Sequence, residues 1–197
     1  MSIVDLPRTF PYQPVRMSVE RYHALTRAGA FTEHDSVELL DGVVTEKMSK
    51  NPPHRIATRR CDLALARIVP VGWHVQNQEP ITLQNSEPEP DVSVVRGQLL
   101  DYAERHPQMG DVALVIEVAD TTLVTDRFKG QLYAQAGIPV YWIVNLSDRV
   151  IEVMEAPKLI SGLATYEKST QYSPGDSIPV VIEGKIVAEL PASDLLP

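Results

Sequence analysis

Glu117 stands inside the apolar run 112–118, which otherwise has the pattern of a buried strand. Burying an ionised carboxylate costs so much free energy that proteins pair it, neutralise it or give it a metal ion. The sequence offers partners on both sides: Asp91 opens a second apolar strand at 91–95, and Lys129 falls early in a predicted helix. Two acids and a lysine on adjacent elements indicate metal-assisted phosphodiester chemistry.

Phosphodiester hydrolysis needs an attacking water, charge stabilisation on the scissile phosphate and help for the leaving oxygen. Carboxylate-bound Mg²⁺ or Mn²⁺ with a nearby lysine can supply all three. In this interpretation Asp91 and Glu117 hold the metal, and Lys129 orients or activates the water and contacts the phosphate. Glu38, in the apolar run 37–40, adds a further ligand or holds metal-bound water. No Gly-rich phosphate loop, Ser/His/Asp signature or Cys/His metal spacing competes with this acidic cluster.

The clearest structural pattern is a strand at 112–118, a helix from about 125 to 136 and a second buried strand at 140–144. Gly137 suits the left-handed helix cap, and Pro139 prevents the helix from continuing. Such a unit is expected to form a right-handed parallel crossover, which predicts an α/β fold.

Side-chain alternation in the first of these strands places Glu117 on one face with Val115, and Leu114 and Ile116 on the other. On the helix, Lys129 lies in the first turns, from which its side chain can lean toward the end of the preceding strand. The pattern therefore predicts that the two charged groups approach one another.

The remaining elements are short. Asp41-Gly42 is the dipeptide best suited to a type I′ hairpin turn, so it predicts a hairpin of two four-residue strands. The sequence as a whole predicts a helix beginning after Ser18 and ending at Gly29, a hairpin at 37–40 and 43–46, a helix at 54–69, β-prone pieces at 73–79, 81–84 and 91–95, a brief helix near 99–105, and small strands from 149 onward.

With 197 residues and 44% apolar residues, the chain can bury one substantial core, and no linker is visible. We therefore expect a single domain at 17–197, preceded by an extended, proline-containing arm at 1–16. The only cysteine, Cys61, excludes an internal disulfide framework and is expected to pack within a helix.

The net charge of −8 argues against a protein that coats nucleic acid by neutralising phosphates alone. It is compatible with an enzyme whose bound cations offset a local acidic site. The sequence has no basic segment followed by an apolar stretch at its start, and no run of about 18 apolar residues. We therefore expect a cytoplasmic protein that does not associate with membranes.

Several short motifs occur in an order and spacing that make a specific pattern. They are Val37-Glu38-Leu39-Leu40-Asp41-Gly42, Pro52-Pro53-His54, Glu89-Pro90-Asp91-Val92, Ile116-Glu117-Val118, Asp126-Arg127-Phe128-Lys129, and the block from Tyr133-Ala134-Gln135-Ala136-Gly137 through Tyr141-Trp142-Ile143-Val144. In these motifs the chain resembles the Uma-two family of putative restriction endonucleases, within the PD-(D/E)XK nuclease-like superfamily, over most of residues 17–197.

The resemblance implies a restriction-endonuclease-like core, with a central mixed β-sheet flanked by helices, and a Mg²⁺-dependent nuclease ancestry. It also implies a site built on Asp91 and Glu117, together with Glu38. The superfamily's lysine normally stands two residues after the glutamate, where this chain has Ala119, so Lys129 resembles a relocated replacement. Val140 stands where the family usually has a glutamate, a change expected to affect packing more than metal binding.

Each site residue also has a purely structural interpretation. Glu117 can be a buried acid paired with Arg127, Lys129 or Thr121, and Lys129 can be a solvated helix lysine that buries its stem. Asp91 can begin a strand or cap a turn, and Glu38 can face solvent. His54 is interpreted chiefly as a helix-start or packing residue.

The sequence accordingly predicts an endonuclease that hydrolyses DNA, and cutting both strands of a duplex favours a homodimer. The alternative is a noncatalytic nucleic-acid-binding or protein-interaction module on the same fold, which the displaced lysine favours. A small-molecule metallohydrolase is a third interpretation that fold resemblance does not exclude.

Overall fold

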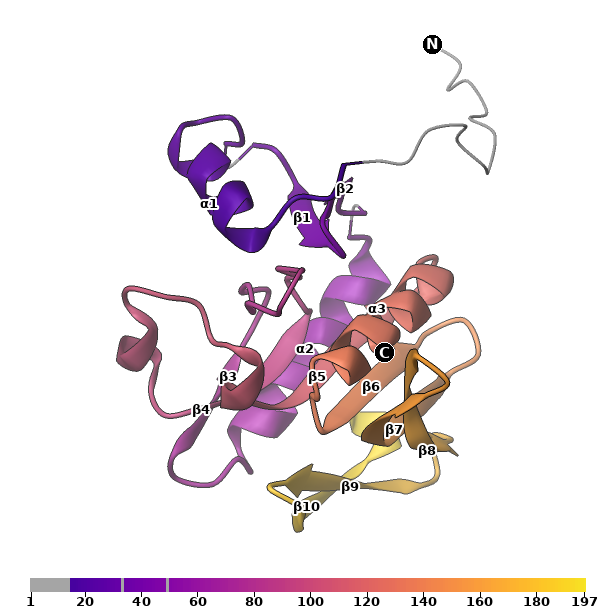
Figure 1. Cartoon of the computed structure of the whole chain (residues 1–197). Coiled ribbons are helices and arrows are strands. Elements are labelled where there is room, and N and C mark those ends of the chain that lie inside the picture. Colours follow the sequence, from indigo (N-terminus) through magenta and orange to yellow (C-terminus); the bar gives the residue numbers. More distant parts are fainter. Residues whose placement is uncertain (1–14, 33, 49) are drawn as a thin grey trace.

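A six-stranded sheet with the order β3-β4-β5-β6-β7-β8 forms the centre of the computed structural model (Figure 1), which describes residues 15–32, 34–48 and 50–197. β5 and β6 are parallel, and every other neighbouring pair is antiparallel. The predicted mixed sheet is thereby confirmed. Its strands are β3 (Trp73–Gln76), β4 (Val92–Arg96), β5 (Val112–Ala119), β6 (Val140–Asn145), β7 (Val150–Ile160) and β8 (Leu163–Tyr172). Most of the expected arm at 1–16 lies outside the described residues.

The predicted parallel crossover consists of β5, α3 (Leu123–Gln135) and β6. Gly137 has φ +75°, so it takes the left-handed conformation that ends the helix, as expected. Gly130 lets the middle of α3 approach the sheet, because a Cβ atom there would come within 2.9 Å of the Tyr141 ring. The hydroxyl of Tyr141 donates to the Asp126 carbonyl at 2.8 Å and fixes this contact.

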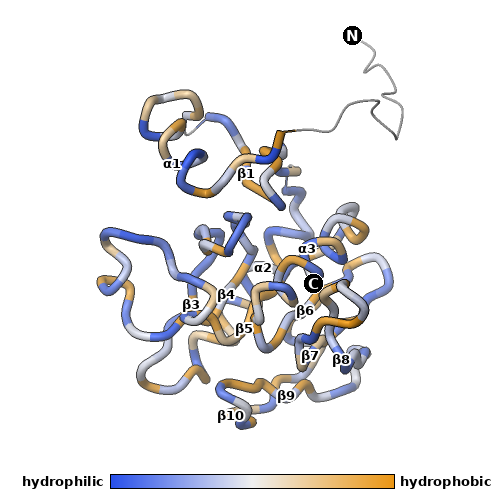
Figure 2. Tube along the Cα trace, viewed as in Figure 1, coloured by the Kyte–Doolittle hydropathy of each residue, from blue (hydrophilic) through white to orange (hydrophobic). Residues whose placement is uncertain are grey.

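The two faces of the sheet carry separate apolar clusters. α2 (Pro52–Ala66), which includes the buried Cys61, packs on one face with the hairpin of β9 (Ser177–Ile182) and β10 (Lys185–Pro191), and α3 covers the other. The hydropathy of the chain follows this arrangement, since apolar residues concentrate along the central strands (Figure 2). The predicted alternation in β5 is confirmed, because Leu114 and Ile116 belong to the α2-side cluster and Val115 to the α3-side cluster.

A helix and a hairpin precede this core. α1 (Val19–Arg27) begins at the predicted cap, Ser18, whose hydroxyl accepts a hydrogen bond from the Arg21 amide at 3.3 Å. β1 (Val37–Leu40) and β2 (Val43–Glu46) form the predicted hairpin, and its turn residues Asp41 and Gly42 have φ +47° and +76°. Positive φ at both positions is what a type I′ turn requires.

Several details differ from the sequence prediction, including the ends of α2 at Ala66 and of β3 at Gln76 in place of 69 and 79. α2 begins at Pro52, two residues early, because Asn51 caps it and prolines in a first turn need no amide partner. The expected strand at 81–84 forms only an isolated bridge, since two of its amides bond within the loop that continues to Pro90. β7 and β8 are long strands instead of small ones, and their partial exposure explains why the apolar pattern was weak.

The other helical segments are single turns: η1 (Leu99–Tyr102), η2 (Met109–Asp111) and η3 (Ala192–Asp194). In the part of the chain that the structure describes, no helix is long and apolar enough to cross a membrane.

Candidate active site

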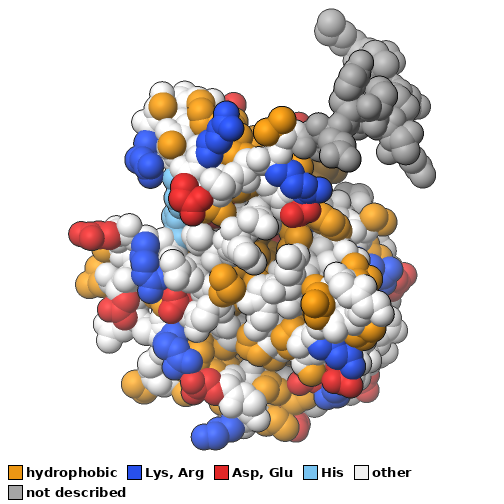
Figure 3. Space-filling model, in the orientation of Figure 1, with side chains coloured by type: hydrophobic (Ala, Val, Ile, Leu, Met, Phe, Trp, Pro, Cys, Tyr) orange, Lys and Arg blue, Asp and Glu red, His pale blue; other side chains and the backbone are white. Residues whose placement is uncertain are grey.

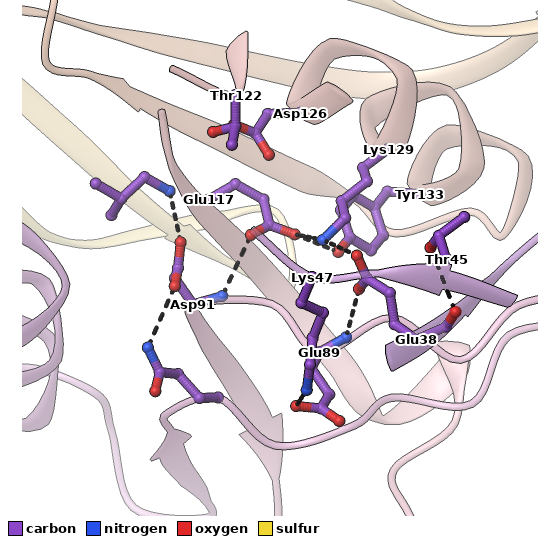
Figure 4. Close-up of polar contacts among 12 residues, drawn as sticks. Glu38, Thr45, Lys47, Glu89, Asp91, Glu117, Thr122, Asp126, Lys129 and Tyr133 are labelled. Atoms are coloured by element: carbon purple, nitrogen blue, oxygen red, sulfur yellow. Dashed lines mark hydrogen bonds and ion pairs between the residues drawn. The ribbon is translucent and has the colours of Figure 1, made fainter. Parts of the chain in front are cut away.

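Glu117 lies in the second half of β5, on the face covered by α3, and only 4% of its surface is exposed. One carboxylate oxygen, Oε1, accepts a hydrogen bond from the Tyr133 hydroxyl at 2.8 Å and lies 3.3 Å from the Lys129 ammonium. The other, Oε2, accepts from the Asp91 amide at 3.4 Å. Figure 4 shows these three contacts converging on the carboxylate.

Lys129 extends from α3 between two carboxylates. Its Nζ atom lies 2.9 Å from Glu38 Oε1 and 3.3 Å from Glu117 Oε1 (Figure 4). Burial by itself would lower the pKa of Lys129, but the negative charges of Glu117 and Glu38 outweigh it and raise the pKa above its ordinary value. Lys129 is therefore an ammonium ion at neutral pH. It pairs with two acids, of which the sequence predicted only Glu117.

Asp91 directly precedes β4 and is held by donors from three elements. Its Oδ2 atom accepts from the Val118 amide at 2.9 Å and lies 3.0 Å from His54 Nε2, while Oδ1 accepts from the Gln78 side chain at 3.4 Å. Burial works to raise the pKa of Asp91, but the hydrogen bond and charge of His54 and the Val118 amide outweigh it and lower the pKa. Asp91 is thus held as a carboxylate beside Glu117.

Glu38 reaches the site because the hairpin is fixed to the loop before β4. Leu39 and Glu87 exchange backbone hydrogen bonds, at 3.4 and 2.7 Å, and Oε2 of Glu38 accepts from the Glu89 amide at 3.2 Å. Glu38 is buried and does not face solvent. At the hairpin, Lys47 pairs with Glu89 beside this contact (Figure 4).

The structure brings all four predicted residues together and adds three that the sequence analysis did not assign to the site. Tyr133 contacts Glu117, His54 contacts Asp91, and the Asp126 carboxylate accepts from the Thr122 hydroxyl at 2.6 Å. Helical spacing offered a signal for two of them, because Tyr133 and Asp126 lie one turn on either side of Lys129. His54 gave no such signal, since α2 and the start of β4 meet only in the folded chain.

All of these side chains except Tyr133 line a cavity of about 90 Å³, which is large enough for a few water molecules or a hydrated ion. It is strongly acidic, and burial raises the pKa of Glu117 to about 8 and that of Asp126 to about 6, although Lys129 acts to lower both. Asn51, at the start of α2, donates to Asp120 at the end of β5 and joins two walls of the cavity.

The predicted metal ligands Asp91, Glu117 and Glu38 line this one cavity, and carboxylate oxygens are the ligands that Mg²⁺ prefers. Lys129 lies between Glu38 and Glu117. Within 15–32, 34–48 and 50–197, no three His, Cys, Asp or Glu side chains are grouped closely enough to hold one metal ion. The donor atoms are of the type that a divalent cation prefers, but their arrangement here is that of an ion-pair network, in which the Lys129 ammonium provides the positive charge between Glu38 and Glu117.

Comparisons with known proteins place this geometry in context. The structure is similar to the crystal structure of a protein from Anabaena variabilis ATCC 29413, described as a putative nuclease belonging to DUF820, with a TM-score of 0.67 and 15% identity over 92% of this chain and 97% of that one. This similarity shows a shared fold. NucC from E. coli MS115-1 in its apo form has a TM-score of only 0.29, with 15% identity over 58% of this chain and 53% of that one, which is too low to show a shared fold.

The search of curated proteins found no match. A family model described as "Putative restriction endonuclease" matches residues 19–187, which include all four predicted site residues. The expected resemblance is confirmed, and because the match spans most of the sequence, the chain belongs to this family, Uma2 (Uma-two).

Proposed function

We propose that the chain is an endonuclease that uses Mg²⁺ or Mn²⁺ to hydrolyse phosphodiester bonds in DNA. One observation carries the proposal: the carboxylates of Asp91 and Glu117 line the same small cavity as the ammonium of Lys129. Membership of a family described as restriction endonucleases supports the same chemistry.

Asp91 and Glu117 would hold the metal ion, with Glu38 as a third ligand. When bound, the ion would supply Lewis-acid stabilisation of charge on the scissile phosphate. The three acids lie on a hairpin, the start of a strand and the middle of a strand, so a rigid sheet and its docked hairpin define their spacing. Rigid supports of this kind favour a precise site.

Lys129 would act as a cation and not as a proton acceptor, because its raised pKa keeps it protonated. In that role it would orient the attacking water and stabilise charge on the phosphate. Tyr133 would hold Glu117 by its hydrogen bond, and His54 would hold Asp91. These two side chains are therefore proposed as positioning residues.

Cleavage of supercoiled plasmid tests the proposal. Purified protein should nick the plasmid with Mg²⁺ or Mn²⁺ and not with EDTA, and Asp91→Asn and Lys129→Met should each lose nicking while keeping a cooperative unfolding transition. Glu167→Gln and Lys185→Gln, which remove the charge of an exposed acid and of an exposed lysine, are the matched controls. Absence of cleavage with every metal would contradict the proposal.

A noncatalytic nucleic-acid-binding module on the same fold is the second candidate. The observation that favours it is the pairing of Lys129 with both Glu38 and Glu117, which neutralises a buried acidic network without a metal. Calorimetric titration separates the two: the nuclease should bind Mg²⁺ and lose that binding in Asp91→Asn, whereas the module should bind none. Cutting both strands of a duplex would further require a homodimer, which sedimentation of the protein on DNA would detect.

A further inference from the structure

A second cavity, of about 290 Å³, lies beside the acidic one. The described residues that line it all carry hydrogen-bond donors, three of them are cations and none is acidic; they are Lys50, Arg55, Thr58, Arg59, Asn77 and Gln78. The first cavity differs in that carboxylates outnumber the lysines that line it. We call the second cavity the basic cavity.

The two cavities are adjacent. Lys50 lines both of them. Gln78 lines the basic cavity, and its side-chain amide donates a hydrogen bond to Asp91 Oδ1 at 3.4 Å. One residue of the basic cavity therefore contacts a proposed metal ligand. Gln78 has φ +57°, a left-handed conformation that is uncommon outside glycine, and its own amide bonds to the Asp91 carbonyl at 3.2 Å. The fold thus maintains a strained residue, Gln78, between the acidic and the basic cavity.

The helix α2 supplies two of the three cations, and Lys50 lies just before it. Arg55 and Arg59 lie one turn apart and therefore project from the same face, and both are exposed. Arg59 pairs with Asp62, whereas among the ion pairs of the described residues none involves Arg55 or Lys50. Thr58, between the two arginines, is buried and lies within hydrogen-bond distance of His54, the residue that contacts Asp91.

Such a concentration of positive charge is local. The chain has a net charge of −8, and on the face drawn in Figure 3 Lys and Arg side chains are interspersed with Asp and Glu side chains. Lysine and arginine side chains beside an acidic site, two of the three without an ion-pair partner among the described residues, match the chemistry of a phosphate backbone, which binds through such contacts and through amide donors. A small anionic metabolite would not need a wall that continues into a second cavity.

We propose that the basic cavity binds the phosphodiester backbone of the DNA strand next to the scissile bond, an inference that rests on the proposed function of the acidic cavity. Arg55, Arg59 and Lys50 contact phosphates, and Asn77 and Gln78 donate hydrogen bonds to them. The cavity therefore supplies affinity that the acidic surface of the rest of the protein lacks, without reading base sequence.

Binding of a short fluorescein-labelled DNA duplex, measured in EDTA over a range of salt concentrations, tests the proposal. Arg55→Gln/Arg59→Gln should weaken binding at least about tenfold at low salt and make the slope of log affinity against log salt shallower by roughly 1 to 2, since each phosphate contact contributes about 0.9. The matched control is Arg67→Gln/Lys185→Gln, which changes net charge equally, with Arg67 at the far end of the same helix. The control should bind as the wild type does.

Two further arms complete the experiment. Asn77→Asp adds one carboxylate to the cavity and should also weaken binding, which keeps the test valid if the double variant fails to fold. An RNA duplex of the same sequence should bind more weakly than the DNA. Equal binding by wild type, double variant and Asn77→Asp, no binding of DNA by the wild type, or preference for RNA would each overturn the proposal.

Cleavage is scored separately on the same proteins. If the wild type binds DNA through the basic cavity but does not cut with Mg²⁺ or Mn²⁺, the endonuclease is contradicted and the backbone site is retained. If the wild type cuts and the double variant binds and cuts equally well, only the backbone site is contradicted.

Discussion

The ammonium of Lys129 lies 3.3 Å from the Glu117 carboxylate although the two residues come from different elements of the fold. The nuclease-like superfamily that the chain resembles normally has its lysine two residues after the glutamate, on the same strand, and this chain has the buried Ala119 there. A helix residue therefore provides the charge that the strand lacks. Ala119 belongs to the apolar cluster on the face toward which Glu117 points, so either position can direct a lysine at the same carboxylate.

Moving the lysine back to the strand tests this equivalence. Lys129→Ala leaves two buried carboxylates without a cation, so we expect cleavage to fall at least about a hundredfold, as for the loss of one preorganised electrostatic group. Adding Ala119→Lys to this variant should restore part of the activity. Plasmid nicking, with thermal unfolding as the check on folding, measures both steps, and Lys158→Ala is the control because that lysine is on the surface. Full cleavage by Lys129→Ala would show that the charge is not needed.

The sequence was sufficient to predict the crossover, and the face of the sheet on which each side chain of β5 lies, because both follow from local rules. Alternation along β5 and the glycine cap of α3 depend only on neighbours in the chain, and the structure confirms them. The prediction that Glu117 and Lys129 meet is confirmed for the same reason, since they belong to one strand–helix unit. Their roles in metal binding and catalysis stay predictions.

The contacts that the sequence did not reveal are those between distant elements. His54 meets Asp91 only because α2 packs across the sheet near the start of β4, and no residue pattern within either segment encodes that approach. Its backbone position at the start of a helix was correctly predicted, but its side-chain partner was not. The sequence also did not predict the basic cavity. Its cations lie within residues 50–59 and its side-chain amides at 77–78, and only the folded chain brings these two segments together.

The role of Glu38 can be tested by Glu38→Gln. If Glu38 is a metal ligand, Mg²⁺ affinity should fall about tenfold, because one oxygen ligand loses its charge. If Glu38 only holds Lys129 through the 2.9 Å contact, Mg²⁺ affinity should stay unchanged while the unfolding free energy falls by roughly 1.5 to 3 kcal/mol. Isothermal titration of Mg²⁺ and chemical unfolding distinguish these results. Glu167→Gln, an exposed residue of β8 that does not line the acidic cavity, is the control.

The Tyr133 hydroxyl favours the charged form of Glu117 because it donates a hydrogen bond to Oε1 at 2.8 Å. Tyr133→Phe removes that donor, so we expect the pKa of Glu117 to rise further and the pH profile of cleavage to move to higher pH, by up to about one unit. Stability should fall by about 1 kcal/mol. The control is Tyr166→Phe, whose hydroxyl donates to the Ile138 carbonyl at 3.0 Å, away from the site. A loss of stability without any shift in the pH profile would mean that Tyr133 only packs.

The final prediction concerns stability in the absence of metal. Burial raises the pKa of Glu117 from its ordinary value of 4.5 to about 8. Between these two pH values the folded protein holds a proton that the unfolded chain has released, so the unfolding free energy must decrease as pH rises. Asp126, raised from 3.8 to about 6, acts in the same direction but only at lower pH. The range from pH 6 to 8 therefore separates the effect of Glu117 from that of Asp126, and comparison with Glu117→Gln removes the common contribution of the histidines.

Across that range, in EDTA, we expect the wild type to lose about 1 to 3 kcal/mol of unfolding free energy, measured by denaturant titration. Glu117→Gln places an uncharged side chain of the same size in the site, so its stability should change much less with pH and should exceed that of the wild type at pH 8. Glu167→Gln, on the exposed surface, should behave as the wild type does. A wild type equally stable at pH 6 and pH 8 would instead show that Lys129 and Tyr133 keep Glu117 ionised throughout, in which case the carboxylate is already prepared for a metal ion at neutral pH.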